Sequence, residues 1–477
     1  MHSLFMDRPG TGRWGLSLAL SLLLPLIGSA QHSEQDIPSD DSLRGASHLY
    51  EMMKRGEVEG RFRQYNMLTI NDGAPSDYHA VAFGGVLGFT SQRWHGTRFK
   101  LAGGYTFDLA TSDLTQLDPV TGLPNRYEIG LYDVNDPRHT NDLAYLHEFQ
   151  LDWVSRSGRT NVVFGKQELN TPFLNPQDGR MHPTLFEGLW ARHRSKHGTT
   201  LEGGWLYRVA PRGASEWYTV SESMDVYPVG RNVYGEAAKH GEVLESAGIF
   251  ALSAKQSLGN KLSVTVWDVY TENIFNSALL QLNAGYLEDR WSISAMAIRQ
   301  DPTATGEHAT DSLAYMPEGQ SSWAFSGRLR NVLGKFRWQL NYTRITADGR
   351  YLMPREWGRD PFFTFLPRER NEGMGDVHAG SLNLIWNDKK SGWRIQLDGG
   401  TYLMPAITDT RLNKYMMPSY AQFDVNAQYR FKGGWQGLAM QLLILGKVPI
   451  ESASLTERQS FNKVDMVHAD LIINYVF

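Results

Sequence analysis

The side chains that most often carry catalysis or bind metals form no recognised motif in this chain. His147-Glu148 begins the pattern of a zinc protease, but Leu151 stands where the second histidine is needed. His193 and His197 have a helical metal spacing, yet we expect them to lie across a strand end and its turn, where that geometry is lost. The chain has no Cys, which excludes thiolate metal sites and a cysteine nucleophile. We therefore predict no catalytic residue, no metal site and no cofactor.

Charged side chains instead recur at every second position between apolar ones. Residues 99–109, 145–153, 336–343 and 423–431 are clear examples. This period of two is typical of a β-strand with one apolar face and one polar face. We predict eighteen such strands, with soft boundaries, at residues 58–70, 79–92, 96–110, 142–155, 159–168, 184–196, 199–210, 245–256, 260–271, 277–286, 290–300, 321–333, 335–347, 376–388, 392–404, 420–431, 437–447 and 464–477.

The connections between these strands alternate between tight turns and long loops. The long loops are residues 111–141, 211–244, 301–320, 348–375, 405–419 and 448–463. Six tryptophans lie in or beside the tight turns, as an aromatic girdle at a membrane interface would require: Trp94, Trp153, Trp291, Trp338, Trp393 and Trp435. The last strand ends at an aromatic residue, Phe477.

These features predict an all-β fold, a transmembrane antiparallel β-barrel of about 18 strands with short periplasmic turns and long extracellular loops. A soluble β-sandwich or propeller is the alternative, because its strands alternate equally well. It would explain neither the girdle nor the regular change of loop length. Closure into a barrel satisfies every strand edge in lipid, where an unpaired backbone group is costly.

A barrel of this size leaves an aqueous channel, so inward side chains would meet passing solutes. By alternation, the inward bases include Arg61, Arg63, Lys100, Arg208, Lys255, Arg328, Arg330, Arg337, Arg394 and Arg430. The inward acids include Glu148, Asp152, Glu202, Asp398, Asp424 and Asp470. Rows of bases would attract carboxylates or other anions. Alternatively, the wall charges pair with one another and only solvate the pore, and a bulge would reverse any such assignment of faces.

The N-terminal region is organised as an export signal followed by a short extension. Residues 1–30 combine Arg8 and Arg13, an apolar run over 15–27 and the small residues at 28–30, which together predict a secretory signal peptide. A signal anchor is the alternative. Residues 31–57 then form a periplasmic extension with a short helix within 43–54, and residues 58–477 form the barrel. The net charge of −4 gives no indication of nucleic-acid binding.

Three segments resemble a known family. They are EGRFRQYNM at 59–67, FGKQELNTPFLNPQDGRMHPTLFEG at 164–188 and EWGRDPFFTFLPRERNEGMGDVHAG at 356–380. They are similar to the matching segments of the OprD family of outer-membrane porins, also described as substrate-specific carboxylate channels. The resemblance runs from about residue 43 to the C-terminus, and the family forms eighteen-stranded barrels. The stretch before the first strand and the long loop 211–244 depart from better-known members, which leaves the substrate open.

The resemblance implies that loops 3 and 7 fold into the barrel and narrow it. In loop 3, residues 170–183, the candidate constriction residues are Asn175, Asp178 and Arg180. Loop 7 contributes charged groups, and the family carries a basic ladder on the wall. The alternative is that Arg368 and Arg370 only pair with Glu369 and Glu372 to hold loop 7 in place. The candidate substrate-binding residues are Arg61, Arg63, Lys100, Asp178, Arg180, Arg208, Arg328, Arg330, Arg337, Arg359, Arg368, Arg370, Arg394 and Arg430.

The function that follows is passive, substrate-selective diffusion of small hydrophilic solutes across the outer membrane of a Gram-negative bacterium, without enzyme activity. Carboxylates, amino acids or small peptides are the expected solutes. The alternatives are a chitoporin-like channel for uncharged sugar oligomers and a barrel enzyme such as a lipase. The expected partners are outer-membrane lipid and lipopolysaccharide, the solutes, and the barrel-assembly machinery through the strand ending at Phe477. The oligomeric state is left open between a monomer and a loose trimer.

Overall fold

The computed structural model describes residues 45–177, 179–286, 290–305, 310–450 and 455–477. The predicted signal peptide at 1–30 lies outside the described residues, as does the extension up to residue 44. The helix expected within 43–54 is present as α1, Leu49–Lys54. Among the described residues, no helix is long and apolar enough to cross a membrane.

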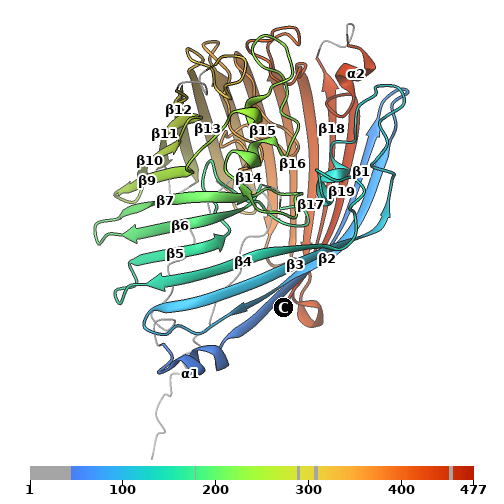
Figure 1. The fold of residues 1–477 in the computed structure, drawn as a ribbon. Coiled ribbons are helices and arrows are strands. Elements are labelled where there is room, and N and C mark those ends of the chain that lie inside the picture. Colours follow the sequence, from blue (N-terminus) through green and yellow to red (C-terminus); the bar gives the residue numbers. More distant parts are fainter. Residues whose placement is uncertain (1–44, 178, 287–289, 306–309, 451–454) are drawn as a thin grey trace, which may run out of the picture.

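The main body is a single antiparallel sheet of nineteen strands that closes on itself (Figure 1). Closure follows from β1, which pairs with β2 on one side and with β19 on the other. The strands are β1 Glu57–Asn71, β2 Tyr78–Thr90, β3 Thr97–Thr111, β4 Leu143–Val154, β5 Thr160–Gln167, β6 Leu185–Arg194, β7 Thr199–Ala210, β8 Tyr218–Thr219, β9 Ile249–Leu258, β10 Leu262–Thr271, β11 Phe275–Tyr286, β12 Trp291–Pro302, β13 Ser322–Leu333, β14 Phe336–Ile345, β15 Val377–Asp388, β16 Trp393–Leu403, β17 Tyr420–Arg430, β18 Leu438–Pro449 and β19 Met466–Val476.

Eighteen of these strands form the barrel wall. The remaining one, β8, has two residues and pairs only with the end of β7, so it belongs to a loop. The predicted barrel of 18 antiparallel strands is therefore confirmed. The first wall strand and the last residue meet at the same end, where the Gly60 amide donates to the Phe477 carbonyl at 3.0 Å.

Long loops leave the opposite end of the barrel, and we number them by their order. Loop 2 is 112–142, loop 3 is 168–184, loop 4 is 211–248, loop 6 is 303–321, loop 7 is 346–376, loop 8 is 404–419 and loop 9 is 450–465. They carry the short helices η2 Glu128–Leu131, η3 Glu222–Asp225, η4 His240–Glu242 and α2 Glu457–Ser460, whereas η6 Gly433–Trp435 lies in a short turn.

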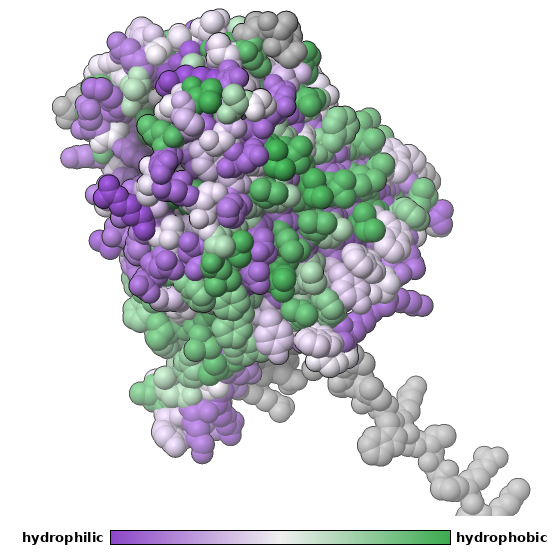
Figure 2. All heavy atoms as spheres, turned by 90° about the vertical axis from the view of Figure 1, so that its right-hand side faces the viewer, coloured by the Kyte–Doolittle hydropathy of each residue, from purple (hydrophilic) through white to green (hydrophobic). Residues whose placement is uncertain are grey.

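The outer face of the wall is apolar, as lipid requires. Leu87, Leu252 and Phe423 expose 59%, 65% and 66% of their area. Figure 2 shows hydrophobic side chains gathered over the wall and hydrophilic ones over the end with the long loops. Near the short turns, the rings of Trp291 and Trp338 meet edge-on with their centres 5.4 Å apart, and Trp435 is largely exposed. This aromatic girdle agrees with a membrane interface at that end.

The inner face is only partly polar, which corrects the expectation of a polar interior on every strand. On the halves of β6 to β12 nearer the long loops the inward side chains are largely apolar; Trp190, Trp267 and Met296 belong to one buried cluster with Phe173 of loop 3 and Trp357 of loop 7. The polar inward face holds for β13 to β19. Loops therefore fill one side of the barrel through apolar packing, and they leave the other side open.

Candidate functional site

An open cavity of about 950 Å³ lies inside the barrel, and we call it the lumen cavity. On the wall it is lined by residues of β13 to β19 and β1, and on its other side by loops 2, 3, 4, 7, 8 and 9. No residue of β6 to β12 lines it. The cavity is therefore off-centre, on the side that the apolar loop packing leaves open.

Positive charge dominates the lining of the lumen cavity. Among the described lining residues, fifteen are Arg or Lys and only three are Asp or Glu. The acids are Glu369, Glu372 and Asp470. The bases are Arg63, Arg126, Arg180, Arg212, Arg231, Arg328, Arg337, Arg355, Arg359, Arg368, Arg370, Lys414, Lys447, Arg458 and Lys463. Such a surplus of one sign in a confined space attracts solutes of the opposite charge.

A ladder of wall arginines continues this charge toward the short-turn end. Arg328 and Arg337 line the lumen cavity, on the neighbouring strands β13 and β14. Alternation along the strands places Arg330, Arg394 and Arg430 on the same inward face. The Arg328 guanidinium lies 4.4 Å from the Phe363 ring centre, and Arg330 donates from Nε to the Ser292 hydroxyl at 2.9 Å.

The wall acids beside this ladder are held by amides. Asn383 donates to Asp398 at 2.7 Å, and Gln422 donates to Asp424 at 2.9 Å. Within the described part of the chain, none of the five ladder arginines forms an ion pair with an acid. Amide donors satisfy the carboxylates without consuming positive charge, so the ladder remains available to solutes.

On the opposite wall the charges do pair with one another. Lys100 contacts Glu148 at 3.1 Å, Arg192 contacts Glu202 at 2.6 Å, and Asp152 lies between two arginines. On this side of the barrel the wall charges therefore pair with one another, as the alternative in the sequence analysis states. Arg61 faces inward on β1 beside this group but does not line the lumen cavity. Lys100 on β3 and Lys255 on β9 also face inward without lining the lumen cavity.

Arg208 is an exception, and its predicted inward position is wrong. The pairing of β6 with β7 shifts register at Glu187 and Gly188, so Tyr207 is an extra residue in β7. Such a bulge reverses the faces beyond it. Arg208 is then the cross-strand neighbour of Glu187. It is exposed and lies on the outer face near the long loops.

Loop 3 is held in place by two of the arginines that were expected to bind solute. Arg63 of β1 donates from Nε to Asn474 at 2.7 Å and from Nη1 to the Gly179 carbonyl at 2.5 Å. Arg180 donates from Nη1 to the Tyr127 carbonyl of loop 2 at 2.6 Å. Both side chains are buried yet border the lumen cavity. Asp178 lies outside the described residues.

Loops 3 and 7 are joined by a set of hydrogen bonds. Asn175 accepts from the Arg359 amide at 3.0 Å and donates to the Arg359 carbonyl at 3.2 Å. Gln177 donates to the Arg355 carbonyl at 2.6 Å and accepts from Arg370 Nη2 at 2.7 Å. The two loops therefore form one constriction, and Arg359 and Arg370 of this constriction line the lumen cavity.

Arg368 holds loop 7 against the wall, but through partners other than those expected. Its Nη2 atom lies 2.6 Å from Asp470 of β19 and 3.0 Å from the Tyr65 hydroxyl. Arg370 bonds Gln177 and the Gly358 carbonyl. The alternative that Arg368 and Arg370 pair with Glu369 and Glu372 is therefore wrong in its partners, although Arg368 does hold loop 7. Glu372 instead lies 3.8 Å from Arg355 and 3.9 Å from Lys414.

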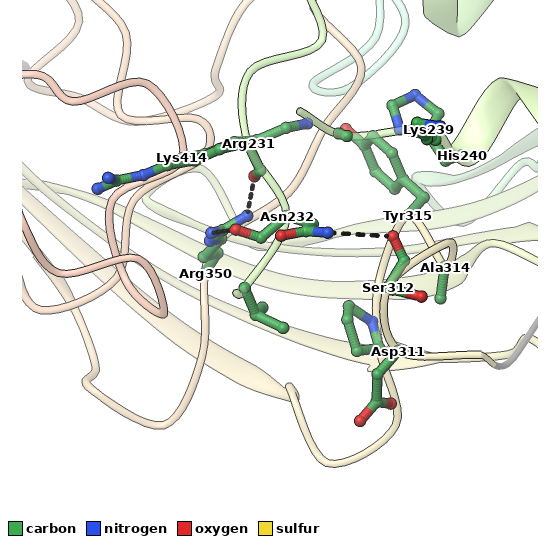
Figure 3. Close-up of a pocket in the computed structure, with 13 residues that line it drawn as sticks. Arg231, Asn232, Lys239, His240, Asp311, Ser312, Ala314, Tyr315, Arg350 and Lys414 are labelled. Atoms are coloured by element: carbon green, nitrogen blue, oxygen red, sulfur yellow. Dashed lines mark hydrogen bonds between the residues drawn. The ribbon is translucent and has the colours of Figure 1, made fainter. Parts of the chain in front are cut away.

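Hydrogen bonds join loops 4, 6 and 7 above the constriction. Arg350 donates to the carbonyls of Arg231 and Asn232 at 2.9 and 3.0 Å, and Asn232 reaches the Ser312 carbonyl of loop 6 at 3.4 Å (Figure 3). Glu356 of loop 7 accepts a hydrogen bond from the Tyr227 amide of loop 4 at 2.9 Å. Burial raises the pKa of Glu356 to about 7. Loop 4, whose role the sequence left open, thus forms part of the pore mouth.

Several lining residues were missed by the sequence analysis. Lys447 on β18 faces inward, but Leu443 and Leu445 face the same way, so the sequence of this strand shows no continuous polar face. Loop 2 also enters the barrel: Thr69 of β1 donates to Glu128 of η2, at 2.5 Å. No periodic pattern marks a loop that folds inward, although the buried aromatic Tyr127 beside Arg126 is a signal in retrospect.

A closed antiparallel barrel with an apolar outer belt, an open lumen and an inward constriction defines an outer-membrane porin. Residues 127–314 match the model of a family described as outer membrane porin, OprD family. This match confirms the predicted resemblance to the family over these residues, and the predicted outer-membrane location agrees with it. No curated protein matches the chain.

Solved structures share the fold at low sequence identity. OpdO of Pseudomonas aeruginosa has a TM-score of 0.65 at 15% identity, covering 90% of this chain and 98% of its own. OccK9 (OpdG) of the same organism has a TM-score of 0.67 at 17% identity, with 89% and 99% covered. OpdK of that organism, solved with vanillate, has a TM-score of 0.66 at 15% identity, again with 89% and 99% covered.

Proposed function

We propose that this porin selects small anionic solutes, chiefly carboxylates, and conducts them by passive diffusion without turnover. The observation that supports it most directly is the fifteen bases against three acids around the lumen cavity. Guanidinium groups bind carboxylates through paired, charge-assisted hydrogen bonds. OpdK, which shares this fold, was solved with vanillate, a carboxylate. Amino acids and small peptides carry the same group and fall within the proposal.

The solute would first meet loop bases and then the wall ladder. Arg359 and Arg370 stand at the constriction, and Arg328 and Arg337 continue below it on adjacent strands. Since successive sites of similar charge let an ion leave each site as easily as it arrives, the ladder favours passage over tight retention. We propose solute-binding roles for Arg328, Arg330, Arg337, Arg359, Arg370, Arg394 and Arg430, and positioning roles for Arg63, Arg180 and Arg368.

The export and assembly of the chain follow the same proposal. We propose that residues 1–30 are removed during export and that residues 31–57 remain in the periplasm. The final strand, β19, would present Phe477 to the barrel-assembly machinery. Outer-membrane lipid and lipopolysaccharide would cover the apolar belt of the single barrel.

The test is single-channel recording of the refolded protein in a planar bilayer under a salt gradient. We expect discrete conductance steps, a reversal potential with anion preference, and blocking events when benzoate or succinate is added. Cation preference would overturn the anion proposal while leaving a porin. An absence of steps from folded protein would overturn open diffusion itself.

A further inference from the structure

A second group of bases stands at the mouth of the lumen cavity, apart from the wall ladder. Arg126 belongs to loop 2, whereas Arg458 of α2 and Lys463 belong to loop 9, and all three line the cavity. Arg126 donates to the Asn462 carbonyl at 3.4 Å, and Arg458 donates to the Thr121 carbonyl at 3.2 Å. The two loops thus bring these bases together. In Figure 1, α2 lies at the end of the barrel with the long loops.

The scaffold beneath this group is ordered. Thr456 and Gln459 form a capping box that closes the first turn of α2 around Arg458. Phe461 is buried and packs edge-on against Tyr78 of β2, with ring centres 6.3 Å apart. A site built on such fixed elements loses little entropy when it binds a ligand.

The charges within this group repel one another. The charged side chains that act on Lys463 are all positive, namely Arg126, Arg231 and Arg458; together with burial they lower the pKa of Lys463 to about 8. Arg231 is committed to three carbonyls of loop 8, so it is structural. Within the described residues, Arg126, Arg458 and Lys463 form no ion pair with an acid. Like charges held together without an acid are stabilised when an anion binds between them.

An unpartnered donor lies in the same place. The Asn462 side chain is buried and borders the cavity, and its Nδ2 atom has no hydrogen-bond partner among the described residues. A buried donor without a partner is costly and indicates a missing acceptor. Two guanidinium groups, one ammonium and this amide offer more donors than one carboxylate can accept. A group with a charge of −2 and three or more oxygens, such as phosphate, fits them better.

We infer that Arg126, Arg458 and Lys463 form a binding site for a multivalent oxyanion at the mouth of the pore. The inference rests on the proposed function, because it places a capture site for phosphorylated or multiply carboxylated solutes ahead of the constriction. Monovalent carboxylates would pass this site with little retention and meet the wall ladder below.

The experiment uses the full barrel in a bilayer of neutral phospholipid, with chloride carrying the current. Inorganic phosphate and sulfate are added to the side that the long loops face, and acetate serves as the monovalent probe. We expect phosphate and sulfate to block the current at concentrations about tenfold lower than acetate. The triple variant R126Q/R458Q/K463Q should raise the half-blocking phosphate concentration about tenfold. The control R138Q changes an exposed loop 2 arginine that does not line the cavity, and should have no effect.

Three results would overturn the inference: block by acetate equal to that by phosphate, block unchanged in the triple variant, or phosphate block that is lost when lipopolysaccharide is added to the bilayer. The last result would mean that the bases serve a lipid headgroup. The double variant R126Q/R458Q, which changes only exposed side chains, repeats the test if the triple variant does not fold. The chloride-to-potassium permeability ratio distinguishes failure of this inference from failure of the proposed function. If only the mouth site is absent, the pore still prefers chloride; if the proposed function is wrong, that preference is absent too.

Discussion

At the scale of single residues, the arginines of this pore have two roles: some hold the loops and the wall together, and others face the solute. Arg63, Arg180 and Arg368 donate to backbone carbonyls or to buried polar side chains. Arg328 and Arg337 face the cavity without an acid partner in the described chain. The same side chain thus serves two purposes, and the partner atoms decide which.

The role of holding loop and wall together predicts a large effect on stability for Arg368→Gln. The substitution removes the arginine from buried Asp470, which keeps its contact with His468 at 3.2 Å, and breaking a buried pair costs about 3–5 kcal/mol. The heat-modifiable migration of the folded barrel in detergent gels should shift to clearly lower temperature. Arg299→Gln is the matched control, because its pair with Asp301 on the outer wall is partly exposed and contributes about 0–1 kcal/mol. Equal shifts for both variants would contradict the assignment.

The solute-facing role predicts a change of selectivity for the double variant R328Q/R337Q. Two positive charges leave the wall of a confined pore, so the chloride-to-potassium permeability ratio should fall severalfold. Reversal potentials in a salt gradient measure this ratio. Arg344→Gln, on the outward face of β14, removes an equal charge per site outside the lumen and should leave the ratio unchanged. A ratio that stays constant in the double variant would remove the ladder from the selectivity mechanism.

At the scale of elements, strands were predictable and loops were not. The alternation of apolar and polar residues located all eighteen wall strands, because lipid on one side and water on the other impose a period of two. It failed at Arg208, where one extra residue in β7 reversed the faces. It also missed Lys447, whose inward neighbours are leucines. The courses of loops 2, 4 and 9 depend on contacts such as Arg350 with the Arg231 carbonyl, which join residues far apart in sequence.

The joint between loops 3 and 7 predicts that Gln177→Ala loosens the constriction. Gln177 links Arg355, Thr184 and Arg370, and each hydrogen bond contributes about 1 kcal/mol, so detached loop conformations should become at least about fivefold more populated. Single-channel records should then show a larger mean conductance and more open-channel noise. The control Gln116→Ala removes a bond within the exposed part of loop 2 and should leave the records unchanged. Identical noise in both variants would show that loop 3 is held elsewhere.

At the scale of the whole molecule, apolar loop packing against β6 to β12 forces solute and charge to the same side of the barrel. The cavity lies beside β13 to β19, where the arginine ladder and the loop lysines also lie. An off-centre passage keeps a solute within reach of the ladder along its course, which a central channel through an eighteen-stranded barrel would not. Selectivity is therefore a consequence of how the loops fill the barrel as well as of which residues line it.

This arrangement predicts that anion preference falls as pH rises from 7 to 9. Burial lowers the pKa of Lys414 to about 8, and burial with nearby arginines lowers the pKa of Lys463 to about 8 as well. Deprotonation above that pH removes two positive charges from the cavity, whereas the arginines keep theirs. The chloride-to-potassium permeability ratio should therefore decrease across this range, and the K463Q variant should show a lower ratio at pH 7 with a flatter profile. A ratio that is constant from pH 7 to 9 in the unmodified protein would mean that the arginines alone set the field of the pore.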